Sequence, residues 1–127
     1  MQEKQLYEYA VIRVVPKVER EEFLNVGIIL YCKKQGFLQT KYILNKQRLS
    51  IFGAELDFEE LEKHLQTWQK ICIGGKEGGP IGALPIASRF RWLTATRSTI
   101  VQTSKTHPGY CKSADETLIY LFEKLVL

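Results

Sequence analysis

Residues 7–33 read YEYAVIRVVPKVEREEFLNVGIILYCK and contain two apolar strand patterns joined by a short charged connector. Both faces of residues 6–15 and of residues 23–32 are largely apolar, which is typical of strands covered on both sides of a sheet. Pro16 ends the first pattern, because proline has no amide hydrogen to donate to a strand ladder. Because it is apolar on both faces, the first strand is expected to be central, and the short connections favour an antiparallel meander of residues 6–15, 23–32 and 37–44.

Further strand signals lie on either side of a helical region. Residues 37–44 alternate more plainly, with Gln39 and Lys41 on one side, so we expect a half-exposed strand nearer to an edge of the sheet. Residues 99–103 form a weaker strand candidate. The sequence His-Pro-Gly at residues 107–109 is typical of a turn.

Two helices are predicted from capping boxes, in which an N-cap side chain and the residue three positions later bind the free amides of the first turn. The first box is Asp57 with Glu60, and this helix ends at the glycines of residues 74–75. The second box is Ser113 with Glu116. Apolar residues recur at helical spacing after both boxes, which gives each helix a buried stripe.

The remaining segments are predicted to form two short helices and a glycine-rich loop. Asn45 is a candidate cap for a short helical segment stopped by Gly53, and residues 85–93 form another short helix. Residues 74–85, GGKEGGPIGALP, are predicted as a mobile loop. We therefore expect one α+β domain over residues 1–127: an antiparallel sheet of three or four strands, with the two main capped helices packed against it.

The composition is that of a mildly basic chain that needs neither a disulfide nor a metal ion to stabilise its fold. The 127 residues are 45% hydrophobic and carry a net charge of +4, which permits an anionic partner without requiring one. Three widely spaced cysteines, Cys32, Cys72 and Cys111, predict reduced thiols. Neither a signal-peptide pattern nor an apolar run of about 18 residues is seen. The expectation is a cytoplasmic protein that does not span a membrane.

The residues that usually carry catalysis are scarce. Asp57 and Asp115 are the only aspartates, and both suit the first turns of helices, which argues against an aspartate-based metal site, dyad or triad. We predict no metal site and no cofactor. Of the two histidines, His107 is the better catalytic candidate, with Cys111 four residues away or a glutamate as its partner.

A basic segment follows the glycine-rich region. Residues 78–114 contain no acidic residue but five cations: Arg89, Arg91, Arg97, Lys105 and Lys112. The run Arg-Phe-Arg-Trp at residues 89–92 interleaves guanidinium and aromatic groups, a mixture that suits phosphate contacts and base stacking. The alternative is that the aromatic residues belong to the core and the arginines pair with the glutamates of residues 19–22.

Arg13 is the unusual residue of the first strand, because a buried arginine is costly unless its donors are bound. Glu21 or Glu22 is a possible bidentate partner, Asn25 a possible amide contact, and Gly27 would allow a close approach by backbone or ligand. Arg13 thus belongs either to a buried ion pair or to an anion-binding pocket. The candidate anion-binding residues are Arg13, Arg20, Glu22, Asn25, Arg89, Arg91, Arg97 and His107.

Two motifs carry a family resemblance. The runs YAVIRVVP…EREEFLNVGIIL and SRFRWLTATRST, followed by HPG, resemble the bacterial domain-of-unknown-function family 3037 over residues 7–126. The resemblance implies recurring positions at Arg13, Pro16, Arg20, Glu22, Asn25, Gly27, Arg89, Phe90 and Arg97. The family resemblance implies no known biochemical activity. It does imply a protein partner, a HipA-like protein of kinase fold.

Three functional hypotheses follow. The leading one is a small non-catalytic accessory or interaction module. The second is a binder of a phosphate-bearing ligand or nucleic acid through its arginines, and the third is an enzyme that uses His107.

Overall fold

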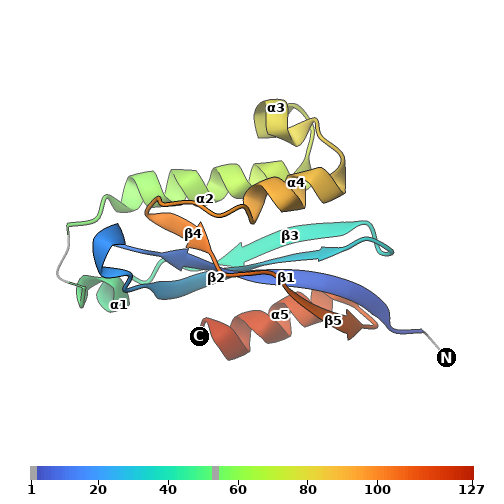
Figure 1. Cartoon of the computed structure of the whole chain (residues 1–127), viewed down its shortest axis with the longest axis horizontal. Coiled ribbons are helices and arrows are strands. Elements are labelled where there is room, and N and C mark those ends of the chain that lie inside the picture. Colours follow the sequence, from blue (N-terminus) through green and yellow to red (C-terminus); the bar gives the residue numbers. More distant parts are fainter. Residues whose placement is uncertain (1–2, 53–54) are drawn as a thin grey trace.

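A computed structural model describes residues 3–52 and 55–127 of the chain. It is an α+β fold in which helices cover both faces of one antiparallel sheet (Figure 1). The strands are β1 (Gln5–Val14), β2 (Leu24–Cys32), β3 (Phe37–Tyr42), β4 (Val101–Thr103) and β5 (His107–Cys111). The helices are η1 (Val18–Arg20), α1 (Lys46–Ser50), α2 (Phe58–Ile73), η2 (Lys76–Gly78), α3 (Gly79–Gly82), α4 (Ile86–Leu93) and α5 (Ala114–Leu125). The α+β prediction is confirmed.

The central position of β1 is also confirmed. The order along the sheet is β3-β2-β1-β4, and β5 pairs with the other half of the same edge of β1 that β4 occupies. All of these pairings are antiparallel. The sheet thus has five strands rather than three or four. The extra strand is β5: His107 to Gly109 were expected to turn, but they extend the ladder opposite Tyr7 to Tyr9.

The predicted caps are in place. The Asp57 side chain accepts a hydrogen bond from the Glu60 amide at 3.2 Å, and Ser113 accepts one from the Glu116 amide at the same distance. Asn45 caps α1 in the same way, through the amide of Arg48 at 3.0 Å. Such caps typically stabilise a helix by about 1 kcal/mol each. The predicted stop of this helix at Gly53 lies outside the described residues.

Two apolar cores lie on opposite faces of the sheet. One includes Ile12 and Val14 of β1 and packs against α2 and α4. The other includes Val11 and Ile28 and packs against α5. Figure 1 shows this layering, with α2 and α4 on one face and α5 on the other. Because successive side chains of a strand point to opposite faces, an apolar strand such as β1 serves both cores.

Residues 74–85 are more ordered than the loop that their composition predicts. They form η2 and α3, and the Gly75 amide donates to the carbonyl of Gly82 at 3.0 Å. A Cβ atom on Gly82 would lie 2.5 Å from the Gly75 carbonyl oxygen. The glycines here permit close backbone contact, so they build a compact turn.

The irregular point in the β1–β2 ladder coincides with the Asn25-Val26-Gly27 sequence. Ile12 pairs with Gly27 but Arg13 pairs with Asn25, so Val26 is an extra residue in a bulge. A Cβ on Gly27 would lie 2.7 Å from the carbonyl oxygen of Lys41. Gly27 therefore allows the backbone of β3 to approach, as the sequence suggested.

Candidate functional site

Arg13 lies on the α5 face of the sheet, directly opposite Asn25 of β2 and Gln102 of β4. Its guanidinium carbon is 4.0 Å from the centre of the Phe23 ring, within the range of a cation–π contact. Its Nε atom is buried and has no hydrogen-bond partner among the described residues. Nor does Arg13 form an ion pair with any described residue. Within the described chain, the half-buried Arg13 guanidinium thus has the Phe23 ring beside it but neither an ion pair nor a partner for its Nε.

Arg97 comes from the segment between α4 and β4 and is fixed in place. It donates to the carbonyl oxygens of Leu93, at 2.8 Å, and of Trp92, so it caps the C-terminus of α4. Its guanidinium also lies 4.5 Å from the centre of the Trp92 ring and 5.3 Å from that of Trp68. Burial lowers the pKa of Arg97 from its ordinary value. An anion near this side chain would offset that cost.

The two arginines line one cavity of about 330 Å3. Its other lining residues are Val15, Val18, Glu21, Phe23, Ser98 and Gln102. Glu21 is the only described non-glycine residue with a positive φ, at 57°. Glu21 is the C-cap of η1, where this left-handed conformation is common. The charged groups that line the cavity are therefore two guanidinium groups and one carboxylate.

Arg89 lies elsewhere and has a structural role. Its Nη1 atom donates to the carbonyls of Ile71, at 2.8 Å, and Cys72, at 2.7 Å, and its Nε atom donates to Leu84 at 3.0 Å. The first two carbonyls belong to the last turn of α2, whose dipole favours a positive charge. Arg89 therefore holds α2 against the segment that leads into α4.

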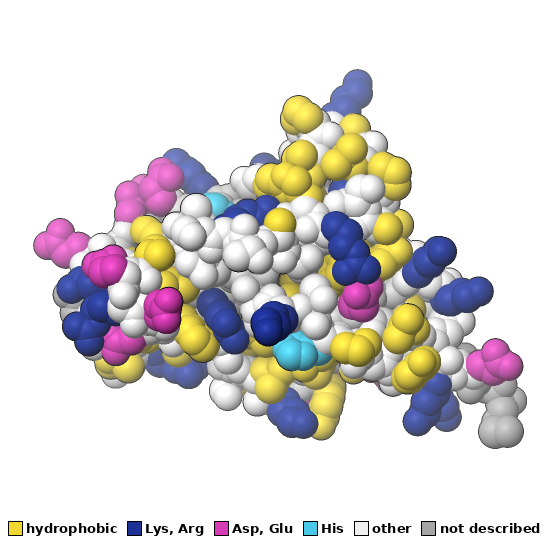
Figure 2. Space-filling model, in the orientation of Figure 1, with side chains coloured by type: hydrophobic (Ala, Val, Ile, Leu, Met, Phe, Trp, Pro, Cys, Tyr) yellow, Lys and Arg dark blue, Asp and Glu magenta, His cyan; other side chains and the backbone are white. Residues whose placement is uncertain are grey.

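Arg91 and its aromatic neighbours do not form an open stacking surface. Arg91 makes a bidentate pair with Glu8 of β1, at 3.0 and 2.8 Å, rather than with the glutamates of residues 19–22. Phe90 is fully buried, and Trp92 is covered in part by Arg97. Figure 2 shows the basic side chains spread over the visible face, without a continuous basic stripe.

The connector residues pair with one another instead of with Arg13. Glu22 binds Arg20 in an exposed ion pair, so the expected pair between Arg13 and Glu21 or Glu22 is not formed. The reason is local, because Arg20 is only two residues from Glu22 in the turn of η1. The Asn25 amide nitrogen donates to the Leu125 carbonyl at 3.2 Å, at the C-terminal end of α5.

His107 and Cys111 are not brought together. Both lie on β5, and four residues of extended strand span about 13 Å. His107 is exposed and packs beside the Tyr9 ring, with 5.3 Å between ring centres. Cys111 is buried, and burial raises the pKa of its thiol. No cluster of three or more His, Cys, Asp or Glu side chains suited to a metal ion occurs among the described residues.

Arg13 and Arg97 are candidates from the sequence, and Glu21 was named there as a possible partner of Arg13, whereas the other residues that line their cavity were not named as site residues. Gln102 becomes a neighbour of Arg13 only through the pairing of β1 with β4, which no local pattern reveals. Phe23 was assigned to a strand, and Ser98 to no element. The position of Glu21 follows from its left-handed backbone, a conformation for which its side chain gives no signal.

Comparison with known proteins places this chain in a family. Residues 9–126 match the family described as protein of unknown function, DUF3037. The chain belongs to the DUF3037 family. No curated protein and no solved structure matches this member of the family. No helix in the described part of the chain is long and apolar enough to cross a membrane.

Proposed function

We propose that this DUF3037 protein is a non-catalytic binding module that recognises a phosphate-bearing ligand in the cavity between Arg13 and Arg97. The observation that carries the proposal is the guanidinium of Arg13, which has a buried Nε without a partner and no ion pair within the described chain. Buried polar groups in folded proteins are nearly always hydrogen-bonded, so an unsatisfied one calls for an explanation. A bound anion supplies it.

The lining residues favour a small ligand with one anionic group. The planar fork of Arg13 suits bidentate contact with two phosphate oxygens, and Arg97 adds a fixed positive charge. The hydroxyl of Ser98 and the amide of Gln102 are neutral hydrogen-bonding groups. Glu21 suits a hydroxyl or amine elsewhere on the ligand, and its negative charge opposes highly charged polyanions.

A small phosphate ester is favoured over nucleic acid by the roles of the other arginines. Arg89 binds helix carbonyls and Arg91 binds Glu8, so neither is free to follow a nucleic-acid backbone. Binding to a nucleic acid would also depend steeply on salt, because several phosphates would be neutralised together. A single phosphate group in a cavity gives a shallow salt dependence.

Isothermal titration calorimetry with phenyl phosphate and AMP tests the proposal, with a twelve-nucleotide single strand as the nucleic-acid probe. We expect Arg13→Gln to weaken binding of the small phosphates about tenfold or more, since one charge-assisted hydrogen bond contributes about 1.5–3 kcal/mol. Arg91→Gln removes the same charge at an exposed site and should leave binding within about twofold. Equal binding by Arg13→Gln and the parent would refute the proposal. Binding of the oligonucleotide alone would favour the nucleic-acid alternative.

An accessory role through a protein partner is compatible with such a module. The HipA-like protein that the family resemblance implies is our candidate partner. A binding measurement between the two purified proteins, with and without phenyl phosphate, tests this part separately.

A further inference from the structure

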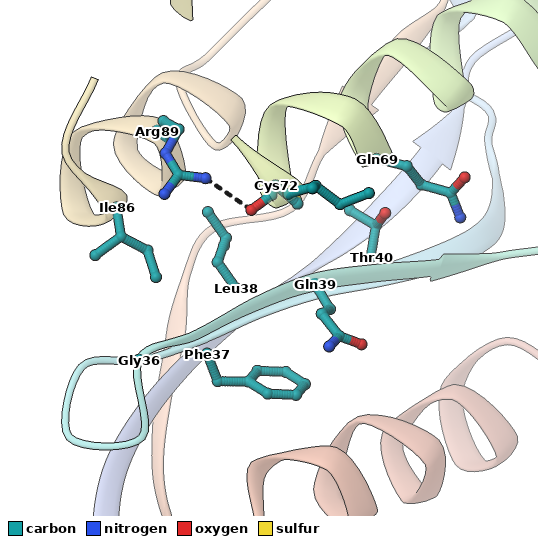
Figure 3. Close-up of a pocket in the computed structure, with 10 residues that line it drawn as sticks. Gly36, Phe37, Leu38, Gln39, Thr40, Gln69, Cys72, Ile86 and Arg89 are labelled. Carbon is teal, nitrogen blue, oxygen red and sulfur yellow. Dashed lines mark hydrogen bonds between the residues drawn. The ribbon is translucent and has the colours of Figure 1, made fainter. Parts of the chain in front are cut away.

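The outer edge of β3 borders a second cavity, of about 550 Å3 (Figure 3). One side of the cavity is formed by residues 36–40, and the other by Gln69, Cys72 and Ile73 at the end of α2 together with Ile86 and Arg89 of α4. We call it the β3 groove. Leu38 packs in the core on the α2 face, whereas Phe37 packs in the core on the α5 face. Because side chains from both faces line one cavity, the groove runs along the open edge of the strand.

Backbone hydrogen-bonding groups point from β3 into this groove. Among the described strands, β3 pairs only with β2, and the amide of Ile43 donates to the Val26 carbonyl at 2.8 Å. In an antiparallel ladder such bonds recur at every second residue, so Phe37 and Gln39 direct their backbone groups toward β2. Leu38 and Thr40 direct theirs outward. Within residues 3–52 and 55–127 no other backbone group or side chain binds them.

The groove also carries a positive charge that forms no ion pair with the described residues. Arg89 is the one charged residue among those that line it. Its Nε and Nη1 atoms bind carbonyl oxygens, but its Nη2 atom makes no hydrogen bond with the described residues. In Figure 3 the Arg89 guanidinium lies across the groove from Leu38 of β3. The groove is thus complementary to a carboxylate.

Edge strands are usually protected from pairing by charged side chains. On β3 that protection is confined to Lys41, near the end of the strand, and the segment from Phe37 to Thr40 carries no charge. Apolar contacts are available beside it, because Ile86 is only partly buried and Ile73 is 80% exposed. An added strand would therefore find backbone partners and apolar surface at the same place.

We propose that the β3 groove binds an extended peptide segment of a protein partner as an added strand, with a carboxylate of that segment bound by Arg89. Addition of a strand to an exposed sheet edge is a common mode of peptide recognition. The peptide exchanges hydrogen bonds with Leu38 and Thr40, and alternate side chains contact Ile86 and Ile73. This site lies at the opposite edge of the sheet from the Arg13 cavity, so either proposal can fail without the other.

The test uses the full chain and a synthetic array of eight-residue peptides rich in Val, Thr and Ile. Each peptide is made with a free C-terminal carboxylate, as the C-terminal amide, and as the amide with one internal Asp. We expect binding by peptides that carry either carboxylate and a loss of about tenfold or more for the neutral amide. Preference between the two charged forms identifies the source of the carboxylate. Absence of binding throughout the array, or equal binding by neutral peptides, would overturn the proposal.

A matched pair of substitutions locates the contact on the strand edge. Thr40→Pro removes an amide hydrogen that faces the groove, and proline is tolerated at such edge positions because the ladder to β2 does not use that amide. Thr40→Val removes the hydroxyl but keeps the amide. We expect Thr40→Pro to weaken peptide binding about tenfold and Thr40→Val to leave it within about twofold. Equal binding by Thr40→Pro and the parent would count against strand addition.

Two further measurements cover the cases in which Thr40→Pro does not fold or a second copy of the chain occupies the edge. If Thr40→Pro fails to fold, hydrogen–deuterium exchange on the unmodified chain replaces it: bound peptide should slow exchange at Leu38 and Thr40, and unchanged exchange there would reject the site. Sedimentation of the chain without peptide reports self-association. A dimer that Thr40→Pro dissociates would show that a second copy of the chain occupies the edge, and this outcome overturns the partner-peptide proposal.

Discussion

Arg89 of α4 and Arg13 of β1 are both half-buried arginines, but their surroundings in the fold differ. Arg89 donates three hydrogen bonds to backbone carbonyls at the ends of two segments. Arg13 has no ion pair within the described chain, and its buried Nε has no partner. A buried donor without a hydrogen-bond partner is costly, and in the half-buried Arg13 the Nε is such a donor. Arg89 is therefore explained by the architecture, whereas Arg13 needs a reason outside it.

Arg97 combines the two roles. It caps α4, as Arg89 caps α2, and it also lines the cavity with Arg13. Arg91, two residues after Arg89, lies on the surface with Glu8. The basic segment is thus divided among structural, surface and cavity positions, although its sequence suggests one continuous site.

The largest effect is expected for Arg89→Ala. Truncation leaves three carbonyls without their charged donor, so we expect the free energy of unfolding to fall by about 3 kcal/mol. Arg91→Ala removes the partly exposed pair with Glu8 and should cost less than about 1 kcal/mol. Urea denaturation of both variants measures the difference. Similar losses for the two would contradict a structural role for Arg89.

Arg13→Met should act in the opposite direction on stability. It replaces a guanidinium that has an unsatisfied buried nitrogen with an apolar chain of similar length, so we expect a gain of about 1 kcal/mol and a rise in Tm of about 3–6 °C. Binding of phenyl phosphate should fall about tenfold or more in the same variant. Arg13→Lys keeps the charge but not the planar fork, and should bind at an intermediate level.

Stability lost on Arg13→Met would mean that the contact with Phe23 outweighs the unsatisfied nitrogen. Arg13 would then resemble Arg89, and the contrast between them would disappear. A gain in stability together with lost binding is the combination expected of a residue kept for function.

Much of the fold follows from local sequence patterns. The apolar runs of β1 and β2, the Asp57 and Ser113 caps and the alternation of β3 all predict the observed elements. The strand at His107 to Cys111 was missed because Pro and Gly normally signal turns. It forms through long-range pairing with Tyr7, whose ring occupies the space that a Cβ on Gly109 would need.

The site was only partly predictable, for a physical reason. An arginine among β-branched residues is visible in the sequence, so Arg13 is a candidate from the sequence alone. The arginine that lies in the same cavity as Arg13 is determined by how α4 and β4 pack near β1. In this fold it is Arg97, whereas Arg89 binds the carbonyls of α2. Sequence separation does not encode such a choice, because both helix carbonyls and an anion attract a guanidinium.

Substitutions at Gly74 and Gly75 distinguish the cost of crowding Arg89 from the cost of an unfavourable backbone conformation. Both have a positive φ, of 85° and 87°. A Cβ on Gly74 would lie 2.9 Å from Nη1 of Arg89, whereas a Cβ on Gly75 would meet nothing within 4 Å. Their ψ angles, 176° and −163°, place both in a region that is essentially restricted to glycine, so we expect Gly75→Ala to cost about 1–3 kcal/mol from the backbone alone and Gly74→Ala about 1 kcal/mol more. Thermal denaturation measures both, and equal losses would show that Arg89 moves aside freely.

The smallest expected effect is a change in the pKa of His64, which is sensitive to the positive charge of Arg97. The pKa of His64 is lowered below its ordinary value of 6.5. Burial is the larger cause, and the positive charge of Arg97 is the smaller one. The unfolded chain then binds this proton more tightly than the folded chain. The contribution of His64 to stability is therefore full above about pH 6.5 and is lost as pH falls toward the lower pKa of the folded state.

NMR titration of the His64 ring tests this coupling. Arg97→Gln should raise the pKa of His64, because it removes the positive charge but leaves most of the burial by α2 and its neighbours. Arg91→Gln makes the same change in net charge at the pair with Glu8 and should leave the titration of His64 where it is in the parent. An identical response to both substitutions would mean that His64 senses net charge rather than Arg97. Arg97 would then not be the fixed, partly buried cation that distinguishes the Arg13 cavity from the exposed position of Arg91.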